Sequence, residues 1–443
     1  MNDKFLRAAA VSALALLCAT RAPARPADGG QALPAAASPE ALGFDAERLA
    51  RLDSAMAKVV ADGRVAGMTT LLMRHGRVVE FKTYGKTTLA GARTTAADDI
   101  FRVYSMTKPI TGVAMMILFE EGKWRLDDPV TKFVPEFAAL KVMTGIDAAG
   151  NITTEAVKRP PTMREIMSHT AGLGYGLQTD NPVDKLFRKT EVLNSTSLKQ
   201  LVERTAAIPL KFQPGTNWAY SDAVDIQGYI VEKLSGMPLD QFMQARIFKP
   251  LKMTDTGFMV REGQTARLAG LYDGFTKDGS LQETKKIFGF PLPEATKPPP
   301  YFMGGGGLVS TTTDYARFCQ MILNKGELYG ARVLSPATVE LMGTNVIPQS
   351  VLVSSNGTGW DRFNEATGFG LDFMVVNDPR KAGSLEGKNT MSWGGAAGTW
   401  FWIDPTNDVV FVGMIQRFGG VPGQDLGGLA RTLTYQALTH PEK

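Results

Sequence analysis

The spacing of apolar residues predicts a helix near the start of the folded chain and a β-hairpin after it. From about residue 44, apolar side chains recur every three or four positions, which is typical of a helix that buries one face. These positions are Leu49, Leu52, Met56 and Val59. Two β-rich apolar runs follow, at residues 68–73 and 78–84, and the Arg-His-Gly-Arg segment between them predicts a hairpin turn.

The C-terminal part of the chain repeats this arrangement in reverse. Residues 399–403 and 409–415 are apolar, β-rich runs on either side of a segment, 404–408, that has the composition of a turn. A helical pattern follows at residues 426–438. Two hairpins at opposite ends of a chain are most economically placed in one antiparallel sheet, so we expect one sheet with the first and last helices over a face.

The middle of the chain has a different character. Helical patterns separated by Gly- and Pro-bearing loops lie at residues 162–168, 197–205, 223–234 and 239–247. We therefore predict a fold of the α/β (α+β) class, in which an antiparallel sheet flanked by helices forms a discontinuous lobe, residues 25–110 and 300–443. A mainly helical lobe, residues 111–299, would interrupt it. The shapes of three long segments, 141–159, 180–197 and 281–300, do not follow from the pattern.

Composition excludes several classes of protein. The chain has 443 residues, of which 44% are hydrophobic and 21% charged, so it is neither disordered nor fibrous. Few histidines and cysteines occur, namely His75, His169, His440, Cys18 and Cys319. This inventory cannot form a Cys/His zinc cage, and it leaves few histidines for a Ser-His-Asp triad. We expect no metal site and no cofactor.

The N-terminus has the order of a secretory signal peptide. Two basic residues, Lys4 and Arg7, precede an apolar run at residues 8–19 and a small-residue cleavage site at residues 22–24. The run is too short for a membrane-spanning helix, so we expect removal of residues 1–24 and an exported protein, periplasmic or secreted, without an integral membrane span. An unprocessed apolar N-terminus is the alternative.

Cleavage would also change the charge and the cysteine content. The removed segment carries three basic residues and one acidic residue, so the net charge of +4 would fall to about +2. A chain with so little excess charge gives no indication of a nucleic-acid partner. Lipidation at Cys18 is disfavoured by the bulky Leu17 before it, and the mature chain would keep only Cys319, which excludes an internal disulfide.

Ser105 and Lys108 are the strongest candidates for chemistry. The apolar residues after them have the spacing of a buried helix, namely Ile110, Val113, Ala114, Ile117 and Leu118. A spacing of three places Ser105 and Lys108 on one face of the first turn, where free N–H groups favour an oxyanion. An apolar core would desolvate Lys108 and let it accept the serine proton. An N-cap serine followed by a solvated lysine is the alternative.

Two further segments are candidates for the same site. Tyr220, in the sequence Tyr-Ser-Asp before a helix, could exchange protons with Ser105, although a tyrosine before a helix cap is common. Residues 392–398, Ser-Trp-Gly-Gly-Ala-Ala-Gly, indicate a close approach of another group to the backbone, and an N–H there could stabilise an oxyanion. A β-bulge or a plain loop is the alternative for this segment.

A third glycine-rich segment, residues 304–307, lacks the Lys-Ser/Thr of a phosphate loop. Glycines in this position before a strand predict close packing of the backbone. The run could also border the active site.

The order S-x-x-K, then Y-S-D, then W-G-G resembles the serine β-lactamase and penicillin-binding protein superfamily. The chain is most similar to the family VIII carboxylesterases, which are relatives of class C β-lactamases. Further matching stretches lie at residues 102–108, 126–130, 169–173, 214–215 and 305–308. The resemblance implies a β-lactamase/transpeptidase-like fold that forms one catalytic unit at about residues 44–440. A G-x-S-x-G elbow is absent from the sequence, which argues against an α/β-hydrolase.

The resemblance implies roles for individual residues. Ser105 would be the nucleophile, Lys108 its activating partner, and Tyr220 the general base and acid. The backbone N–H groups of Ser105 and Ala396 would form the oxyanion hole. His169 lies in a His-Thr-Ala-Gly-Leu turn that is structural in this family, so we expect it to form local hydrogen bonds rather than to act as the base.

Two departures from the β-lactamase pattern favour neutral esters. Trp393 occupies the position of the lysine in the K-T-G box, and an indole cannot hold a carboxylate as a cation does. Asp222 replaces an asparagine, and a carboxylate there would repel an anionic substrate. The predicted substrate-binding residues are Tyr104, Trp218, Asp222, Trp393, Gly394 and Gly395. Aromatic residues near the motifs are compatible with an apolar acyl pocket or with core, namely Tyr104, Trp218, Phe302, Trp393 and Trp400.

The sequence therefore predicts a serine hydrolase that cleaves small-molecule carboxylic esters with short or apolar acyl groups, without cofactor or metal. A β-lactamase or D-amino-acid peptidase and an acyltransferase are alternatives on the same site. A catalytically silent sensor domain is an alternative of a different class. The natural substrate and the oligomeric state do not follow from the sequence.

Overall fold

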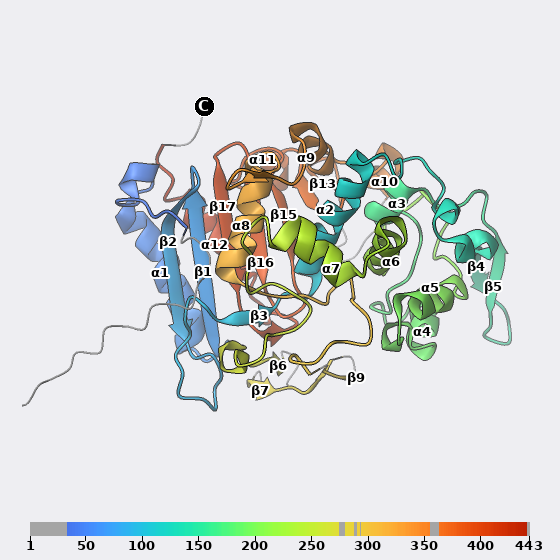
Figure 1. Ribbon diagram of the computed structural model, residues 1–443, viewed down its shortest axis with the longest axis horizontal. Helices are drawn as coiled ribbons and strands as arrows, with labels where there is room; N and C mark the ends of the chain where they lie inside the picture. The colour runs from blue at the N-terminus through green and yellow to red at the C-terminus, as the bar shows by residue number, and fades with distance from the viewer. Residues whose placement is uncertain (1–32, 274–279, 288–289, 293, 355–362, 441–443) are drawn as a thin grey trace, which may run out of the picture.

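The computed structural model describes residues 33–273, 280–287, 290–292, 294–354 and 363–440. The predicted signal segment, residues 1–24, lies outside the described residues. Figure 1 shows a sheet lobe, built from the first and last parts of the chain, beside a helical lobe built from the middle part. This is the α+β arrangement that the sequence predicts, whereas the lobe boundaries at residues 110 and 299 stay a prediction.

An antiparallel sheet forms the centre of the first lobe. Among the described residues it has seven strands in the order β13-β14-β15-β16-β17-β1-β2. The strands are β1 (Gly67–Arg74), β2 (Arg77–Gly85), β13 (Thr367–Phe369), β14 (Met374–Val376), β15 (Met391–Gly394), β16 (Trp400–Asp404) and β17 (Val409–Met414). β1 pairs with β17, with Leu71 opposite Val412. The two hairpins from opposite ends of the chain therefore lie side by side, as predicted.

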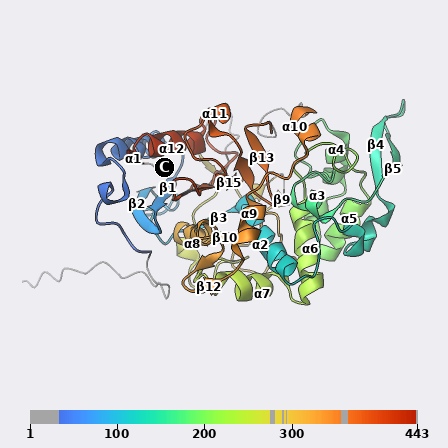
Figure 2. The ribbon, with the colours of Figure 1, turned by 90° about the horizontal axis from the view of Figure 1, so that it is seen from above.

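Helices cover both faces of this sheet. Figures 1 and 2 show α1 (Ala46–Ala61) and α12 (Leu426–Tyr435) on one face and α8 (Thr312–Leu323) on the other. The four apolar positions of α1 are buried, as predicted, in a cluster with Leu72 and Trp402. Neighbouring strand residues point to opposite faces, so Leu71 belongs instead to the large core on the α8 side.

The helical lobe contains α3 (Met163–Met167), α4 (Pro182–Lys189), α5 (Leu198–Ala206), α6 (Ala223–Ser235) and α7 (Leu239–Met243). A π-helical turn, Gln244–Phe248, continues α7. The hairpin of β4 (Lys141–Ile146) and β5 (Ile152–Ala156) projects at the edge of this lobe (Figure 1). Among the described residues, every helix is too short or too polar to cross a membrane.

Short elements connect these parts. The strands are β6 (Tyr272–Asp273), β7 (Gln282–Glu283), β8 (Lys286–Ile287), β9 (Phe290–Pro291), β11 (Glu327–Leu328), β12 (Ala331–Arg332) and β18 (Arg417–Phe418). The α-helices are α9 (Pro336–Met342), α10 (Gln349–Ser354) and α11 (Pro379–Ala382). The 3-10 turns include η1 (Glu40–Leu42), η3 (Val130–Lys132), η4 (Pro135–Ala139), η5 (Val192–Asn194) and η7 (Thr265–Arg267).

Helix α2 (Thr107–Glu120) lies at the junction of the two lobes. Its residues Thr107 to Leu118 are all buried, and it packs along α6. β3 (Ile100–Arg102), which leads into α2, pairs antiparallel with β10 (Val309–Thr311). This pairing brings the glycine run 304–307 beside the start of α2.

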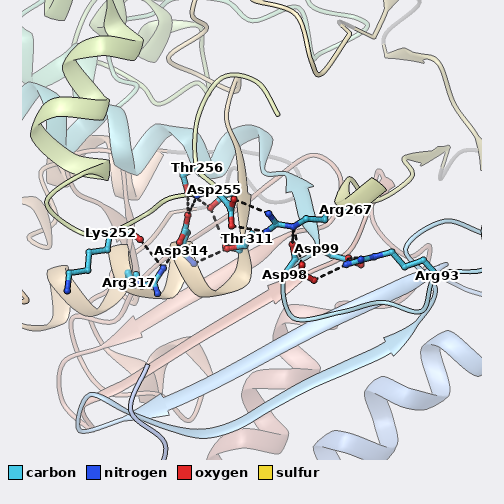
Figure 3. Close-up of polar contacts among 11 residues, drawn as sticks. Arg93, Asp98, Asp99, Lys252, Asp255, Thr256, Arg267, Thr311, Asp314 and Arg317 are labelled. Carbon is cyan, nitrogen blue, oxygen red and sulfur yellow. Dashed lines mark hydrogen bonds and ion pairs between the residues drawn. The ribbon is translucent and has the colours of Figure 1, made fainter. Parts of the chain in front are cut away.

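Ion pairs of Arg267 connect the loop before β3 to the segment that precedes η7, and a hydrogen bond connects that segment to α8 (Figure 3). Arg267 donates to both carboxylate oxygens of Asp255, at 3.1 and 2.8 Å, and lies 3.2 Å from Asp98. The backbone N–H of Asp255 donates to Asp314 on α8 at 2.7 Å. Because the Arg267 side chain is only 14% exposed, solvent screens these contacts less than it screens a surface pair.

Replacement of Arg267 by methionine tests this cross-link. Asp255, which is 12% exposed, would lose its cation, whereas Asp98 is 38% exposed and keeps an ion pair with Arg93. We therefore expect the free energy of unfolding to fall by about 2 kcal/mol. Urea denaturation measures the change. As a matched control, Lys58→Met removes an ion pair with Asp62 whose lysine is 73% exposed, and it should cost less than about 0.5 kcal/mol. Equal effects of the two substitutions would contradict a structural role for the Arg267 network.

Candidate active site

Ser105 is half-buried and lies in a 3-10 turn, η2 (Tyr104–Met106), that runs directly into α2. The α-helix therefore begins at Thr107, two residues after the serine. Tyr104 has a φ of +43°, in the left-handed region that a bulky side chain rarely adopts, so the backbone is strained immediately before Ser105. The hydroxyl of Tyr315 on α8 donates to the Met106 carbonyl at 2.8 Å and so anchors the turn to α8.

Lys108 is the buried partner of this serine. Its side chain is 1% exposed, and its Nζ lies 3.2 Å from Ser105 Oγ. The same nitrogen lies 3.2 Å from the Tyr175 hydroxyl and donates to the Gly305 carbonyl. The serine and the lysine that the sequence singles out are thus in contact, and the lysine is desolvated by the apolar helix as expected.

The glycine run, residues 304–307, lies at the site because Lys108 donates to the Gly305 carbonyl. A Cβ on Gly305 would lie 2.7 Å from Asp225 Oδ2 and 3.1 Å from the Tyr175 hydroxyl, and one on Gly304 would lie 2.6 Å from the Val224 carbonyl. Such distances are too short for any side chain. The run packs closely against α6, as the sequence predicts, and it also borders the site.

The ring of Tyr220 faces the Lys108 amino group. The lysine Nζ is 4.7 Å from the ring centroid of Tyr220 and 5.0 Å from that of Tyr175. Sequence reasoning missed Tyr175, although it follows the His-Thr-Ala-Gly-Leu turn by two residues. Burial raises the pKa of Tyr175 well above its ordinary value, and the charge of Asp225 adds to this effect. The Tyr175 hydroxyl therefore stays protonated and can donate or accept a hydrogen bond.

His169 is fully buried, and its hydrogen-bond partner is Ser221, 52 residues away in sequence, rather than a neighbour in its own turn as the sequence predicts. Its Nδ1 lies 2.9 Å from the Ser221 hydroxyl and accepts from the Ser221 backbone N–H at 3.3 Å. Burial lowers its pKa well below the ordinary value, and the nearby charge of Lys108 acts in the same direction. The imidazole is therefore neutral, and it anchors the residue that follows Tyr220.

Aromatic rings line the Tyr220 side of the site. Trp393 on β15 lies 5.4 Å from Tyr220 and 5.3 Å from Phe369, measured between ring centroids. Trp218 stacks on Tyr220 at 6.2 Å and meets Phe363 edge-on at 4.7 Å. We call these five residues, Trp218, Tyr220, Phe363, Phe369 and Trp393, the aromatic wall.

The segment after β15 reaches the other side of Ser105. Ala396 and Tyr104 pack in one apolar cluster with Phe418, whose ring meets that of Tyr104 at 6.2 Å. A Cβ on Gly395 would lie 2.4 Å from the carbonyl of Val103, two residues before the serine. Gly395 also donates to the Thr399 carbonyl at 2.7 Å, and Gly394 pairs with Trp400. Because Gly395 lacks a side chain, this turn can pack directly against the nucleophile turn.

The structure changes the interpretation of Asp222. Its carboxyl is fully buried and accepts from the Thr205 hydroxyl of α5 at 2.6 Å. Burial raises the pKa of Asp222 to about 8, so the group is neutral at pH 7 and does not repel an anion as a carboxylate would. A direct contact of Asp222 with substrate stays a prediction.

Trp400 and Phe302 also differ in position from the other aromatic candidates. Trp400 stacks on Phe411 in the cluster under α1 and α12, on the sheet face opposite to Trp393. It is therefore core rather than part of an acyl pocket. Phe302 packs on Phe258 at 5.1 Å.

No metal ligands gather within the described residues, where groups of three or more His, Cys, Asp and Glu in a suitable arrangement are absent. Cys319 is a free thiol buried in α8.

The fold and the relatives together define the chain as a serine hydrolase. The model of the family described as Beta-lactamase matches residues 52–435, and the chain belongs to this family. The chain is 33% identical to Protein Rv1367c of Mycobacterium tuberculosis, over 80% of this chain and 86% of that protein. It is 29% identical to Esterase EstB of Burkholderia gladioli, over 83% of this chain and 90% of that one. The solved structure of EstCE1, described as a hydrolase with promiscuous acyltransferase activity, matches with a TM-score of 0.72 and 25% identity, over 88% of this chain and 99% of that chain.

Substitution of Gly395 by alanine tests the packing beside Ser105. The new methyl group would collide with the Val103 carbonyl and push the turn that carries Ala396 away from the serine. If the Ala396 N–H stabilises an oxyanion, as the family resemblance implies, kcat/KM should fall about 100-fold, the usual loss for one such donor. Gly257→Ala is the control, because a Cβ there meets its nearest atom at 3.8 Å and should leave the rate unchanged. Full activity of Gly395→Ala would show that this contact does not position the turn.

The buried carboxyl of Asp222 predicts a pH-dependent stability. Its folded pKa lies above the unfolded value of 3.8, so its stabilising effect is complete below about pH 4 and is lost as the pH rises to about 8. Asp222→Asn removes this loss, so the Tm of the variant minus that of the wild type should increase from pH 5 to pH 8 and then level off. Thermal unfolding at several pH values measures the difference. Asp62→Asn, at an exposed site, should give a flat difference, and a flat difference for Asp222→Asn would overturn its neutral state.

Proposed function

We propose that the protein is a carboxylesterase that cleaves neutral esters with an apolar acyl group through an acyl-enzyme on Ser105. The observation that carries the proposal is the 3.2 Å contact between Ser105 Oγ and the buried Lys108 Nζ, at the start of an apolar helix. A serine hydroxyl needs such a base to become a nucleophile. The esterase relative EstB, which is similar over 83% of this chain, supports the choice of ester over lactam.

In the first step Lys108 takes up the Ser105 proton. The Gly305 carbonyl can only accept a hydrogen bond, so it holds one N–H of the amine. The step requires the unprotonated amine, whose lone pair accepts the serine proton. As the proton moves to nitrogen, Oγ forms a bond to the ester carbonyl carbon, and the carbonyl oxygen becomes an oxyanion.

The oxyanion would be held by the backbone N–H groups of Ser105 and Ala396. The packing of Gly395 against the Val103 carbonyl supports this assignment, because it fixes the turn that carries Ala396 next to Ser105. When the tetrahedral intermediate collapses, the alcohol leaves with a proton that Tyr220 relays from Lys108. Water then attacks the acyl carbon while Tyr220 takes its proton; the bond to Oγ breaks, the carboxylic acid leaves, and the proton returns to Ser105.

The aromatic wall supports an apolar acyl group. Trp393 stands where β-lactamases carry a lysine, so the site has an indole face in place of a cation that would bind a carboxylate. Tyr104, Gly394 and Gly395 are proposed to complete the substrate contacts on the other side. These residues would exclude water from the acyl chain without any charged group of their own.

Acyl transfer to an alcohol is a second candidate, since the similar structure EstCE1 is described as a hydrolase with promiscuous acyltransferase activity. Both reactions share the same acyl-enzyme and differ in the acceptor that attacks it. We also propose that the protein is exported, on the signal-like order of residues 1–24, and that residues 111–299 form a lobe inserted into the sheet lobe.

A substrate panel with two variants tests the proposal. The purified protein should hydrolyse p-nitrophenyl butyrate and leave the matching anilide, nitrocefin and D-Ala-D-Ala peptides unchanged. Ser105→Ala should abolish turnover with an unchanged Tm. Tyr220→Phe should lower kcat about 10² to 10⁴-fold, the usual contribution of a general acid-base group. A mixed-acceptor assay with water and a primary alcohol separates hydrolysis from transfer by its products.

Two outcomes would contradict the proposal. Turnover by Ser105→Ala would exclude this serine as the nucleophile. A loss of activity in His169→Gln as large as that in Tyr220→Phe, with the fold intact, would assign the base to the histidine. Labelling by a fluorophosphonate, present in the wild type and absent in Ser105→Ala, separates a catalytically silent protein from an enzyme with a different substrate.

A further inference from the structure

Asp225 lies on α6, five residues after Tyr220, and is fully buried. Its Oδ1 accepts from the Gly305 N–H at 2.9 Å, whereas its Oδ2 has no hydrogen-bond partner among the described residues. The carbonyl of the same glycine accepts from Lys108. Asp225 and Lys108 therefore hold Gly305 at its two ends, although neither residue is in an ion pair with the other.

Gly305 is packed so closely that a side chain would not fit there. A Cβ on this residue would lie 2.7 Å from Asp225 Oδ2 and 3.1 Å from the Tyr175 hydroxyl, which itself contacts Lys108. A buried acid with an unpaired oxygen is costly unless a nearby charge compensates for it. Among the described residues, Lys108 is the side chain whose charge lowers the pKa of Asp225. The two groups are thus coupled through one glycine residue.

Several other titratable groups face Lys108 or Asp225, and at neutral pH they carry no charge. Burial raises the pKa of Asp372, which lies in the turn after β13, well above its ordinary value, and that of Asp222 to about 8. His169 is neutral, and burial raises the pKa of Tyr175 and of Tyr301, whose hydroxyls stay protonated. Burial raises the pKa of Asp225 only to about 6, because Lys108 and the Gly305 N–H oppose it.

We propose that Asp225 is a positioning residue for Lys108. Through Gly305 it fixes the lysine beside Ser105, and its carboxylate places a negative charge at the same glycine. Asp225 acts through another residue and has no contact with the ester in the proposed mechanism. The inference rests on the proposed role of Ser105 as the nucleophile, and it adds the residue that controls the base.

Two substitutions separate the charge of Asp225 from its hydrogen bond. In Asp225→Asn the amide oxygen can still accept from the Gly305 N–H, while the charge is lost. We expect the plateau of kcat/KM to stay within about threefold and its acidic limb to move to lower pH by about one unit, because the site loses a negative charge that favours its more protonated form. Asp225→Ala removes the hydrogen bond as well. Its kcat should fall about 10- to 100-fold at every pH, with KM for p-nitrophenyl butyrate changed less than twofold.

Asp404→Asn is the matched control for the loss of a buried carboxyl. Asp404 is fully buried in the sheet lobe, where it accepts from the Gly387 N–H at 2.9 Å and from the Tyr435 hydroxyl at 2.6 Å. This substitution should lower the Tm and leave the pH profile in place. A shift of the acidic limb in Asp225→Asn alone would therefore report on Lys108 rather than on general destabilisation.

The rate at which a fluorophosphonate labels Ser105, measured against pH, gives the same limb without an ester substrate. If the esters are not cleaved but labelling is lost in Ser105→Ala, the ester proposal fails while the test of Asp225 still stands. A pH profile of Asp225→Asn that coincides with the wild type would overturn the role of the charge. Unchanged kcat in Asp225→Ala would overturn the role of the hydrogen bond. If the alanine variant fails to fold, the asparagine variant decides alone.

Discussion

The burial of Lys108 is the constraint on which the rest of the site depends. A lysine amino group in an apolar core is stable only if its N–H groups find hydrogen-bond acceptors. Those partners are Ser105 on the preceding turn, the Tyr175 hydroxyl of the helical lobe and the Gly305 carbonyl, which is 197 residues away in sequence. Because the three come from distant parts of the chain, the lysine is satisfied only when the two lobes meet along α2.

Close approach of backbone to backbone is the second requirement. Gly305 brings a carbonyl to the lysine, and Gly395 brings the turn after β15 to the carbonyl of Val103. Tyr104, the residue before Ser105, has a positive φ, a conformation that persists only if the surrounding structure enforces it. The pairing of β3 with β10 and the Tyr315 hydroxyl on the Met106 carbonyl provide that enforcement. The strain before Ser105 is therefore held by both sheet and helix.

Local elements were predictable from the sequence because their signals are local. The apolar stripe of α1, the two hairpins and the three-residue spacing of Ser105 and Lys108 each depend on neighbours within a few positions. Tyr175 and Asp225 were not predicted, since they reach the lysine only through tertiary contacts. Helix α4 had a start signal, because Asn181 caps it and Pro182 follows, but its segment has no long periodic pattern. The β4–β5 hairpin is exposed on most of its surface, so it lacks the alternation that marks a strand.

The proposed preference for a neutral ester over an anionic substrate rests on the absence of a cation at Trp393, and not on the presence of an anion at Asp222. The sequence offered both arguments, Trp393 in place of a lysine and Asp222 in place of an asparagine. Only the argument from Trp393 holds at neutral pH, because the Asp222 carboxyl is buried against Thr205 and keeps its proton. Trp393 instead packs between Tyr220 and Phe369 and extends the aromatic wall up to the proton-transfer group. In the proposed mechanism, Trp393 therefore leaves no cation at this position of β15 to bind a carboxylate and adds apolar surface to the aromatic wall, and both features favour an uncharged acyl group.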